Sequence, residues 1–226
     1  MNAAARIGIL GGTLDPIHVG HLDTALAARA ALLLDRVIVM PSRVPPHRHH
    51  QPVASRYHRF AMAALAVNGR EGLTVSDMEL CAPGPSYTAD TLSRFQAVSG
   101  RDATQIFFIT GADAFAEIHT WHRYPEVLGL AHFVVVSRPG HPVQELPVRL
   151  PALASRMRLA DAAKSAADSL AIHLVDAPTA DVSSTEIRRR LGSGESLAGL
   201  VPPAVDTHIR QHGLYTSTAD HLHGQD

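Results

Sequence analysis

The sequence predicts an α/β fold of the Rossmann-like, doubly wound type, with a mainly parallel sheet and helices on both of its faces. Two observations lead to this prediction. Several short runs are almost continuously apolar, which is typical of strands buried on both faces. Longer segments with apolar residues at helical spacing separate most of these runs. The chain of 226 residues is long enough for one such domain.

The first elements follow from local composition. Residues 6–10 contain the apolar run Ile-Gly-Ile-Leu and predict a buried strand. The segment 20–34 is rich in alanine and leucine and predicts a helix. Residues 37–40, Val-Ile-Val-Met, predict a second buried strand. Pro41 ends it, because proline has no backbone N–H to donate to a neighbouring strand.

The middle of the chain continues the alternation. Apolar residues recur at helical spacing through 56–67, a short strand is expected at 73–76, and a helix is expected at 89–98. Residues 105–109 carry Ile-Phe-Phe-Ile and predict the next strand. Two short helices, at 114–118 and 124–130, lead to a strand at 132–136.

The pattern is weaker in the last third. A stretch rich in proline and alanine extends to about residue 169 without a clear period. A strand is expected at 171–175, and helices at 184–191 and 204–211. Residues 216–226 are polar and predict a disordered tail. We therefore expect a single domain over residues 1–215.

Composition excludes several classes of protein. The 20 basic and 21 acidic residues nearly cancel, which argues against nucleic acid or a membrane as a partner. The single cysteine rules out an internal disulfide. The single lysine, Lys164, is not part of a Gly-Lys-Ser/Thr phosphate loop. Without a signal peptide or a long apolar run, we expect a cytoplasmic protein.

The most informative segment is residues 11–21, Gly-Gly-Thr-Leu-Asp-Pro-Ile-His-Val-Gly-His, between the first strand and the first helix. Ligands of open parallel sheets bind at this edge. Gly11 and Gly12 let a phosphate approach the backbone N–H groups. His18 and His21 are three residues apart at a helix start, so their rings lie on one face and can donate hydrogen bonds to a phosphate in a transition state.

This segment resembles the GGTFDPxHxGH signature of the HxGH nucleotidyltransferases, with Leu14 in place of the usual phenylalanine. Further stretches narrow the resemblance to the bacterial nicotinate-nucleotide adenylyltransferases: 40–42 with 45–48, 85–92, 109–113, 120–122, 137–140, 182–188 and 211–215. The resemblance implies the HxGH nucleotidyltransferase fold and a role in NAD biosynthesis. It also implies that Thr13 lies close to phosphate. Asp15 belongs to the same signature and is expected at the mononucleotide, although shaping the turn beside Pro16 explains it equally well.

The resemblance also assigns the remaining ATP contacts. Ser183, Ser184, Thr185 and Arg188 would bind the β- and γ-phosphates, and the same segment has the sequence of a capped helix start. Gly111 and Asp113 follow a buried strand, and the carboxylate would accept ribose hydroxyls. A helix-capping aspartate is the alternative for Asp113.

The nicotinate mononucleotide would be held by residues from three places. Trp121 would pack on the nicotinate ring, although a single tryptophan is about as often a core residue. Thr88, at the start of a helix, and a backbone N–H near His122 would receive the ring carboxylate. His47 and Arg48 belong to a proline-stiffened run that we interpret as a phosphate-binding loop. Its histidines lack a partner carboxylate, so we expect no metal site in the protein.

The expected reaction joins the AMP part of ATP to nicotinate mononucleotide and releases pyrophosphate, with Mg²⁺ carried by ATP. Phosphopantetheine and nicotinamide-mononucleotide adenylyltransferases share the HxGH segment and are the rival enzymes. A nucleotide-binding regulator without activity is the rival from another class, although the presence of both histidines argues against it. Whether copies of the chain form a homo-oligomer stays open.

Overall fold

The protein is described by a computed structural model, which covers residues 5–45, 53–160 and 169–216. Seven strands form one sheet in the order β3-β2-β1-β4-β5-β7-β6. Their bounds are β1 Ile7–Gly12, β2 Arg36–Pro41, β3 Leu73–Val75, β4 Ile106–Gly111, β5 His132–Val136, β6 Met157–Leu159 and β7 Ile172–Val175.

The strand order confirms the predicted doubly wound sheet. The chain moves outward from β1 to β3 and returns beside β1 as β4. On the other side it continues through β5 to the edge strand β6, and β7 then lies between β5 and β6. The pairs β1–β4, β4–β5, β5–β7 and β6–β7 are parallel. Leu10 pairs with Ile109 in the register of β1 and β4. Gly11 and Gly111 therefore follow at the same edge of the sheet, where the winding changes direction.

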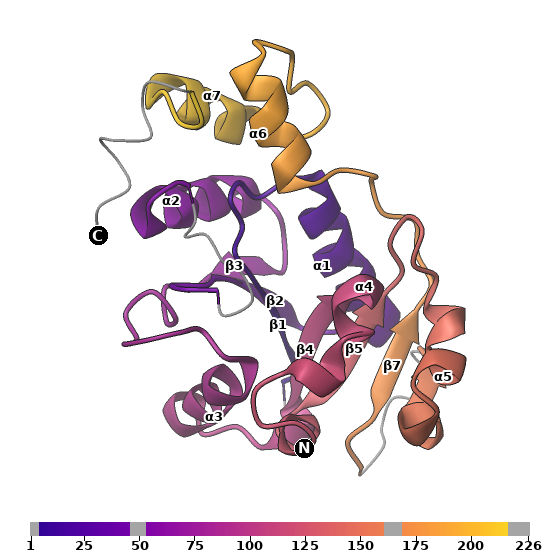
Figure 1. The fold of residues 1–226 in the computed structure, drawn as a ribbon. Helices are drawn as coiled ribbons and strands as arrows, with labels where there is room; N and C mark the ends of the chain where they lie inside the picture. The colour runs from indigo at the N-terminus through magenta and orange to yellow at the C-terminus, as the bar shows by residue number, and fades with distance from the viewer. Residues whose placement is uncertain (1–4, 46–52, 161–168, 217–226) are drawn as a thin grey trace. The chain divides into compact units, whose positions relative to one another are not determined.

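Helices α1 to α5 lie between successive strands from β1 to β6 in sequence, and α6 and α7 follow β7 (Figure 1). Ser55 caps α2 by accepting a hydrogen bond from the backbone N–H of His58, and Gly100 ends α3 in the left-handed conformation (φ 65°). The bounds are α1 Val19–Leu32, α2 Arg56–Val67, α3 Thr88–Ser99, α4 Ala112–Phe115, α5 Leu146–Arg149, α6 Ser184–Gly192 and α7 Pro203–Gln211.

The described chain groups into two compact units that are interleaved in sequence. The first comprises residues 1–11, 23–38 and 87–180, and the second comprises residues 12–22, 39–86 and 181–226. The first unit contains β4, β5 and β7, whose side chains are almost entirely buried. The second contains α2, α6 and α7. The expectation of a single domain over residues 1–215 stays a prediction.

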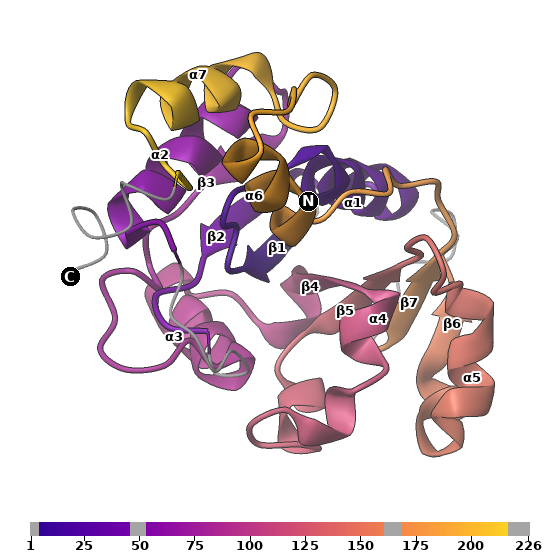
Figure 2. The same ribbon diagram turned by 45° about the horizontal axis from the view of Figure 1, so that its top comes forward.

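Two local expectations were wrong, and the stretch without a clear period contains two short elements. The helix expected at 114–118 is instead the four-residue α4 followed by a 3-10 turn at Ile118–Thr120. The segment expected to be helical at 124–130 is a 3-10 helix, Glu126–Gly129. The patternless stretch contains α5 and the edge strand β6 (Figure 2), which are too short to give a period. Within the described residues, no helix is long and apolar enough to cross a membrane.

Candidate active site

The two histidines of the β1–α1 loop lie together in the second unit. Their rings stack with centroids 3.7 Å apart and an angle of 30° between planes. The side chain of His18 is buried, with 2% of its surface exposed, whereas His21 is half-buried. The first turn of α1 therefore brings the two imidazoles to one place, as their spacing predicts.

A hydrogen bond sets the tautomer of the second ring. The backbone N–H of His18 donates to Nδ1 of His21 at 3.3 Å. A ring nitrogen that accepts a hydrogen bond carries no proton, so the neutral imidazole of His21 has its proton on Nε2. In this tautomer Nε2–H is a hydrogen-bond donor.

Asp15 joins distant segments of the second unit to the same loop. Its carboxylate is buried and accepts hydrogen bonds from the backbone N–H groups of Val53 (2.8 Å) and Ala54 (3.1 Å). The hydroxyl of Tyr215 also donates to it, at 2.7 Å. Burial and the neighbouring carboxylate raise the pKa of Tyr215 well above its ordinary value, so this phenol stays protonated. Asp15 thus fixes the loop, and its contact with the mononucleotide stays a prediction.

Arg59 is a buried residue of α2 that the sequence analysis did not single out. Its guanidinium donates to the backbone carbonyls of Thr13 (2.8 Å) and Ser42 (2.5 Å), which follow β1 and β2. It also donates to the carbonyls of Arg43 and Ala54. Five fixed N–H donors suit an arginine to this task, because several backbone carbonyls converge on it. Nothing in the local pattern of α2 could have indicated these partners.

The start of α6 is attached to the β1–α1 loop. Ser183 caps the helix by accepting from the backbone N–H of Glu186, and the Ser184 hydroxyl donates to the carbonyl of Pro16 at 2.9 Å. Arg188 donates to the carbonyl of Asp15 at 2.6 Å and to the Thr185 hydroxyl at 3.3 Å. Since that hydroxyl accepts from Arg188, its own proton can be donated elsewhere. These hydrogen bonds join the helix start, the loop and Arg188 in one arrangement, and phosphate binding there stays a prediction.

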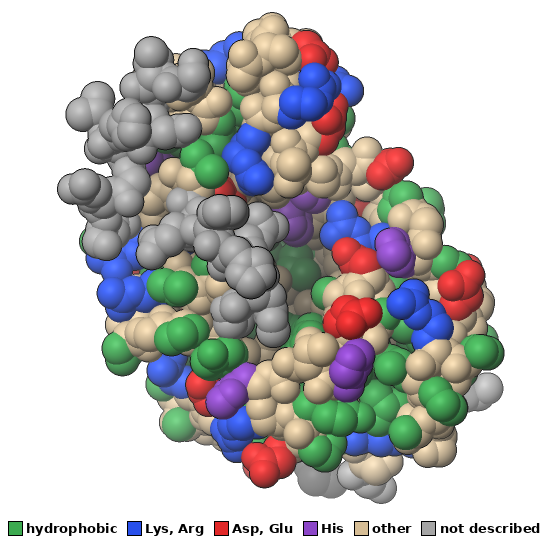
Figure 3. Space-filling model, in the orientation of Figure 1, with side chains coloured by type: hydrophobic (Ala, Val, Ile, Leu, Met, Phe, Trp, Pro, Cys, Tyr) green, Lys and Arg blue, Asp and Glu red, His purple; other side chains and the backbone are tan. Residues whose placement is uncertain are grey.

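The next two arginines of α6 are engaged differently. Arg189 and Arg190 form ion pairs with Glu186 and Glu195 on the surface, with N···O distances from 2.8 Å. Figure 3 shows these basic and acidic side chains gathered over α6. Hydrogen bonds from Arg189 and Arg190 lower the pKa of Glu186 to about 2. This face of α6 is therefore solvated, and of these three arginines only Arg188 is directed to the loop.

In the first unit, the end of β4 requires a glycine. A Cβ at Gly111 would lie 2.5 Å from Oδ1 of Asp113 and 2.7 Å from Cδ of Arg138. The exposed carboxylate of Asp113 and the side chain of Arg138 therefore both pack closely over the Gly111 backbone. Arg138 belongs to the stretch 137–140, which resembles the family, but it is not among the predicted site residues.

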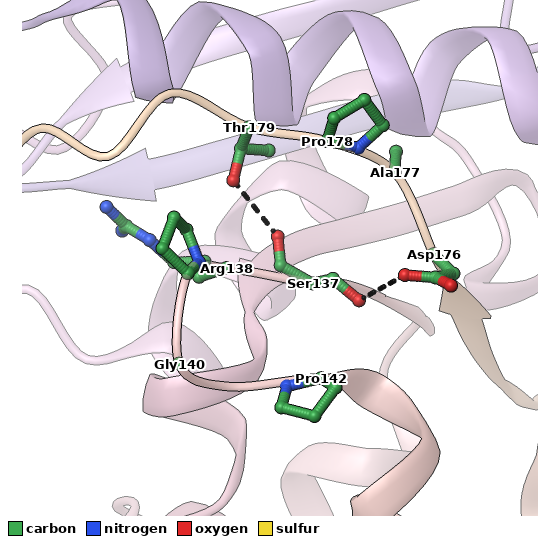
Figure 4. A pocket seen from close by; sticks show the side chains of 9 residues that line it. Ser137, Arg138, Gly140, Pro142, Asp176, Ala177, Pro178 and Thr179 are labelled. Atoms are coloured by element: carbon green, nitrogen blue, oxygen red, sulfur yellow. Dashed lines mark hydrogen bonds between the residues drawn. The ribbon is translucent and has the colours of Figure 1, made fainter.

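A pocket of about 300 Å³ lies beyond the ends of β5 and β7 (Figure 4). Arg138 and Pro178 line it, and its walls are cross-linked by hydrogen bonds. The Ser137 hydroxyl donates to Asp176 at 2.9 Å, and the Thr179 hydroxyl donates to the carbonyl of Ser137 at 3.2 Å. These bonds hold the segments after both strands in place, so the pocket is preformed.

The start of α3 meets the segment that contains Trp121. The rings of Tyr87 and His122 stack with centroids 4.2 Å apart. Arg123 and Asp90 form an ion pair, with Nη1 and Oδ1 3.7 Å apart. The side chain of Tyr87, at the N-cap, makes no capping hydrogen bond to the first turn of α3, which begins at Thr88. These contacts bring Thr88 and His122 to one region of the first unit.

Trp121 combines the two roles that composition left open. It is half-buried, and its ring packs edge-on against Phe108 with centroids 6.0 Å apart. It also approaches Phe133, at 6.3 Å. One side of the indole therefore contacts the core, while its partial exposure leaves surface for a ligand.

The predicted site residues fall into three groups. Those of the second unit are Gly12, Thr13, Asp15, His18, His21, Ser183, Ser184, Thr185 and Arg188; those of the first unit are Gly11, Thr88, Gly111, Asp113, Trp121 and His122. His47 and Arg48 lie outside the described residues.

Comparison with known proteins gives the class first. Residues 9–190 match the family model described as cytidylyltransferase-like. The chain is 39% identical over 218 residues to a probable nicotinate-nucleotide adenylyltransferase of Desulfatibacillum aliphaticivorans, covering 93% of this chain and 99% of the relative. A relative of the same name from Pectobacterium atrosepticum is 42% identical over 211 residues, covering 91% of this chain and 96% of the relative. The chain belongs to the nicotinate-nucleotide adenylyltransferase family.

Solved structures agree on the fold. The chain is similar to Plasmodium falciparum nicotinic acid mononucleotide adenylyltransferase complexed with NaAD, with a TM-score of 0.70 and 17% identity. The match covers 94% of this chain and 98% of that chain. At this identity the likeness concerns the fold alone.

Proposed function

We propose that the protein transfers the adenylyl group of ATP to nicotinate mononucleotide, forming nicotinate adenine dinucleotide and pyrophosphate. The observation that carries this proposal is the stacked pair of His18 and His21 in the glycine-rich loop after β1. Relatives about 40% identical over almost the whole chain carry the name of this activity.

The reaction needs no protein nucleophile. An oxygen of the mononucleotide phosphate attacks the α-phosphorus of ATP in line, a new P–O bond forms, and the bond to the pyrophosphate oxygen breaks. Both reactants are anions, so catalysis requires that the protein hold them together and stabilise the charge that develops. We assign the donation to the α-phosphate to His18 and to Nε2–H of His21, with the amides of Gly11, Gly12 and Thr13 nearby.

The leaving pyrophosphate is assigned to the start of α6. Arg188 contributes a fixed positive charge, and the Thr185 hydroxyl contributes the proton that its bond with Arg188 leaves for donation. The helix N-terminus adds to the positive potential. Ser184, in contrast, already donates its proton to Pro16, so its hydroxyl can act toward the ligand only as an acceptor.

Mg²⁺ is proposed to enter with ATP. A protein-bound Mg²⁺ would need carboxylate oxygens, but those of Asp15 already accept hydrogen bonds from Val53, Ala54 and Tyr215. Because this carboxylate is engaged within the protein, we propose phosphate oxygens and water as the ligands of the ion. When bound there, Mg²⁺ would neutralise charge on the triphosphate.

We place the adenosine of ATP in the first unit. We assign the ribose hydroxyls to Asp113, which packs with Arg138 over the Gly111 backbone. Arg138 also lines the 300 Å³ pocket. A guanidinium can stack on the planar base. The preformed pocket walls suit a flat heterocycle, and the Pro178 ring adds apolar surface.

The mononucleotide carboxylate is proposed to bind at the start of α3. The N-terminus of this helix and Thr88 favour a negative group, which the amide analogue lacks. The direct test is turnover with the acid and the amide mononucleotides side by side, each with ATP and Mg²⁺. We expect at least roughly tenfold higher kcat/KM for the acid, the effect of one charge-assisted interaction.

A variant tests the assignment further. Thr88→Val should lower kcat/KM for the acid and leave that for the amide nearly unchanged. The control is Ser93→Ala on the same helix, whose hydroxyl donates to the backbone of Ala89. Equal turnover of both substrates would contradict the acid-binding role, and no pyrophosphate release with either would favour a regulator.

A further inference from the structure

Three histidines that belong to none of the groups above lie together in the second unit. His58 is in the first turn of α2, and His208 and His212 are one turn apart at the end of α7. The two helices pack against each other and lie side by side in both ribbon views (Figures 1 and 2). The cluster therefore joins residues 150 positions apart in the chain.

The geometry of the cluster is that of a metal-binding set. One ring nitrogen from each histidine can be chosen so that all three lie within 4.8 Å of one another. Nδ1 of His58 is 3.1 Å from Nε2 of His208. Two imidazoles on one tetrahedral Zn²⁺ have their nitrogens about 3.3 Å apart, given Zn–N bonds of about 2.0–2.1 Å. One pair is thus already at ligand spacing.

The third imidazole needs only a small adjustment. The centroid of His212 lies 4.4 Å from that of His208 and 4.8 Å from that of His58. His212 is exposed, so its ring can rotate toward the other two without disturbing the core. The backbone holds the framework in place, because Ser55 caps α2 at His58 and His212 N–H donates to the carbonyl of His208.

We propose that His58, His208 and His212 bind one divalent transition-metal ion of the kind that prefers imidazole, such as Zn²⁺, Co²⁺ or Ni²⁺. Three nitrogen ligands leave a fourth position, which the exposure of His212 makes accessible to water. Hard ions such as Mg²⁺ prefer oxygen ligands and are not expected to bind there. None of these three histidines is assigned to the nucleotide reaction, so the inference goes beyond the proposed function.

The ion would act as a clamp between α2 and α7. The segment after α7 leads to Tyr215, whose hydroxyl binds Asp15 in the β1–α1 loop. On the α2 side, Arg59 follows His58 and donates to the backbone carbonyl of Thr13 in the same loop. The ion would therefore connect two segments that both contact the β1–α1 loop. Metal binding to the folded state raises its stability by mass action.

The test uses the full chain without a histidine tag, titrated with Zn²⁺ against a chromophoric chelator and with Co²⁺ for its absorption spectrum. We expect one ion per chain, a Co²⁺ spectrum of nitrogen ligation and a higher melting temperature with Zn²⁺. Mg²⁺ should leave the melting temperature unchanged when no nucleotide is present.

Variants locate the ion. His212→Ala should lower Zn²⁺ affinity at least ~100-fold and abolish the rise in melting temperature, while His212→Asp, which retains a ligand oxygen, should bind more tightly than the alanine variant. The control is His141→Ala, an exposed histidine outside the cluster, which should bind as the wild type does. Unchanged affinity in His212→Ala would overturn the proposal, as would affinity lost in His21→Ala instead, since that would place the ion at the loop histidines.

Discussion

Two pairs of histidines show how differently the fold uses the same side chain. His18 and His21 stack at the start of α1, where the second ring is half-buried. His132 and His173 lie on neighbouring strands β5 and β7, and both are buried, with 2% and 3% of their surfaces exposed. The first pair lies at the start of α1, after β1 in sequence, and the second is in the sheet itself.

The hydrogen bonds of the strand pair explain its structural role. Nδ1 of His132 accepts from the backbone N–H of Ala171 at 3.1 Å and contacts Nε2 of His173 at 3.2 Å, so His173 is the donor. Phe107 stacks on His132, 4.7 Å between centroids. Burial lowers the pKa of each histidine to about 4. His18 is as buried as His132 and His173, so burial does not distinguish the two pairs. Their location in the fold does: the pair assigned to chemistry follows β1 at a helix start, and the other pair packs within the sheet.

The largest effect on stability is expected from the residue that supports the loop pair. Asp15→Ala removes the acceptor of two buried hydrogen bonds and one partly buried one, and leaves Tyr215 without its partner. We expect a loss of about 3–5 kcal/mol in the free energy of unfolding, together with lower activity. Urea unfolding measures the change in the free energy of unfolding. The control is Asp206→Ala, whose surface ion pair with Arg210 is worth less than about 1 kcal/mol. If Asp15→Ala lowered the free energy of unfolding by less than about 1 kcal/mol, the anchoring role would be refuted.

The strand pair should affect stability without affecting catalysis. His132→Ala removes a buried ring and leaves Ala171 N–H and His173 without their acceptor. We expect about 3 kcal/mol lower stability and an unchanged kcat at a temperature where the variant is folded. The exposed His119→Ala is the matched control. If His132→Ala also lowered kcat well below the wild-type value, the distinction between the two pairs would fail.

Lowering the pH should destabilise the folded protein through the strand pair, His132 and His173. The folded-state pKa values near 4 lie below the ordinary 6.5, so between these values the unfolded chain binds more protons. The contribution to stability is therefore complete above pH 6.5 and is lost as the pH falls toward 4. Between pH 6 and pH 5 we expect a loss of roughly 2 kcal/mol, measured by urea unfolding. A His173→Leu variant should show a flatter dependence, and an equally steep one would assign the effect elsewhere.

The parts of the fold that sequence could predict are those with local signals. The apolar runs at 37–40 and 132–136 became buried strands, and the glycine-rich segment became a turn that leads into a helix with its histidines on one face. Edge strand β6 could not be predicted, because three residues with an exposed Leu159 have no period. The short turns after α4 are 3-10 rather than α-helical, a difference that spacing over four residues does not resolve.

Sequence could nominate candidate ligand-binding residues but not the contacts that support them. The supports are long-range: Tyr215 meets Asp15 across 200 positions, and Arg59 meets Thr13 across 46. Such contacts depend on how the elements pack, which no local pattern encodes. The metal cluster was missed for the same reason, since His58 is separated from its partners by most of the chain.

The most direct test of the proposed mechanism is the kcat of His21→Ala, measured by pyrophosphate release at saturating ATP, Mg²⁺ and nicotinate mononucleotide, with ATP affinity determined separately. If Nε2–H of His21 stabilises the transition state, kcat falls at least ~100-fold while the dissociation constant of ATP changes only a few-fold. A variant that turns over as fast as the wild type would show that the stacked histidines do not act on the reacting phosphate.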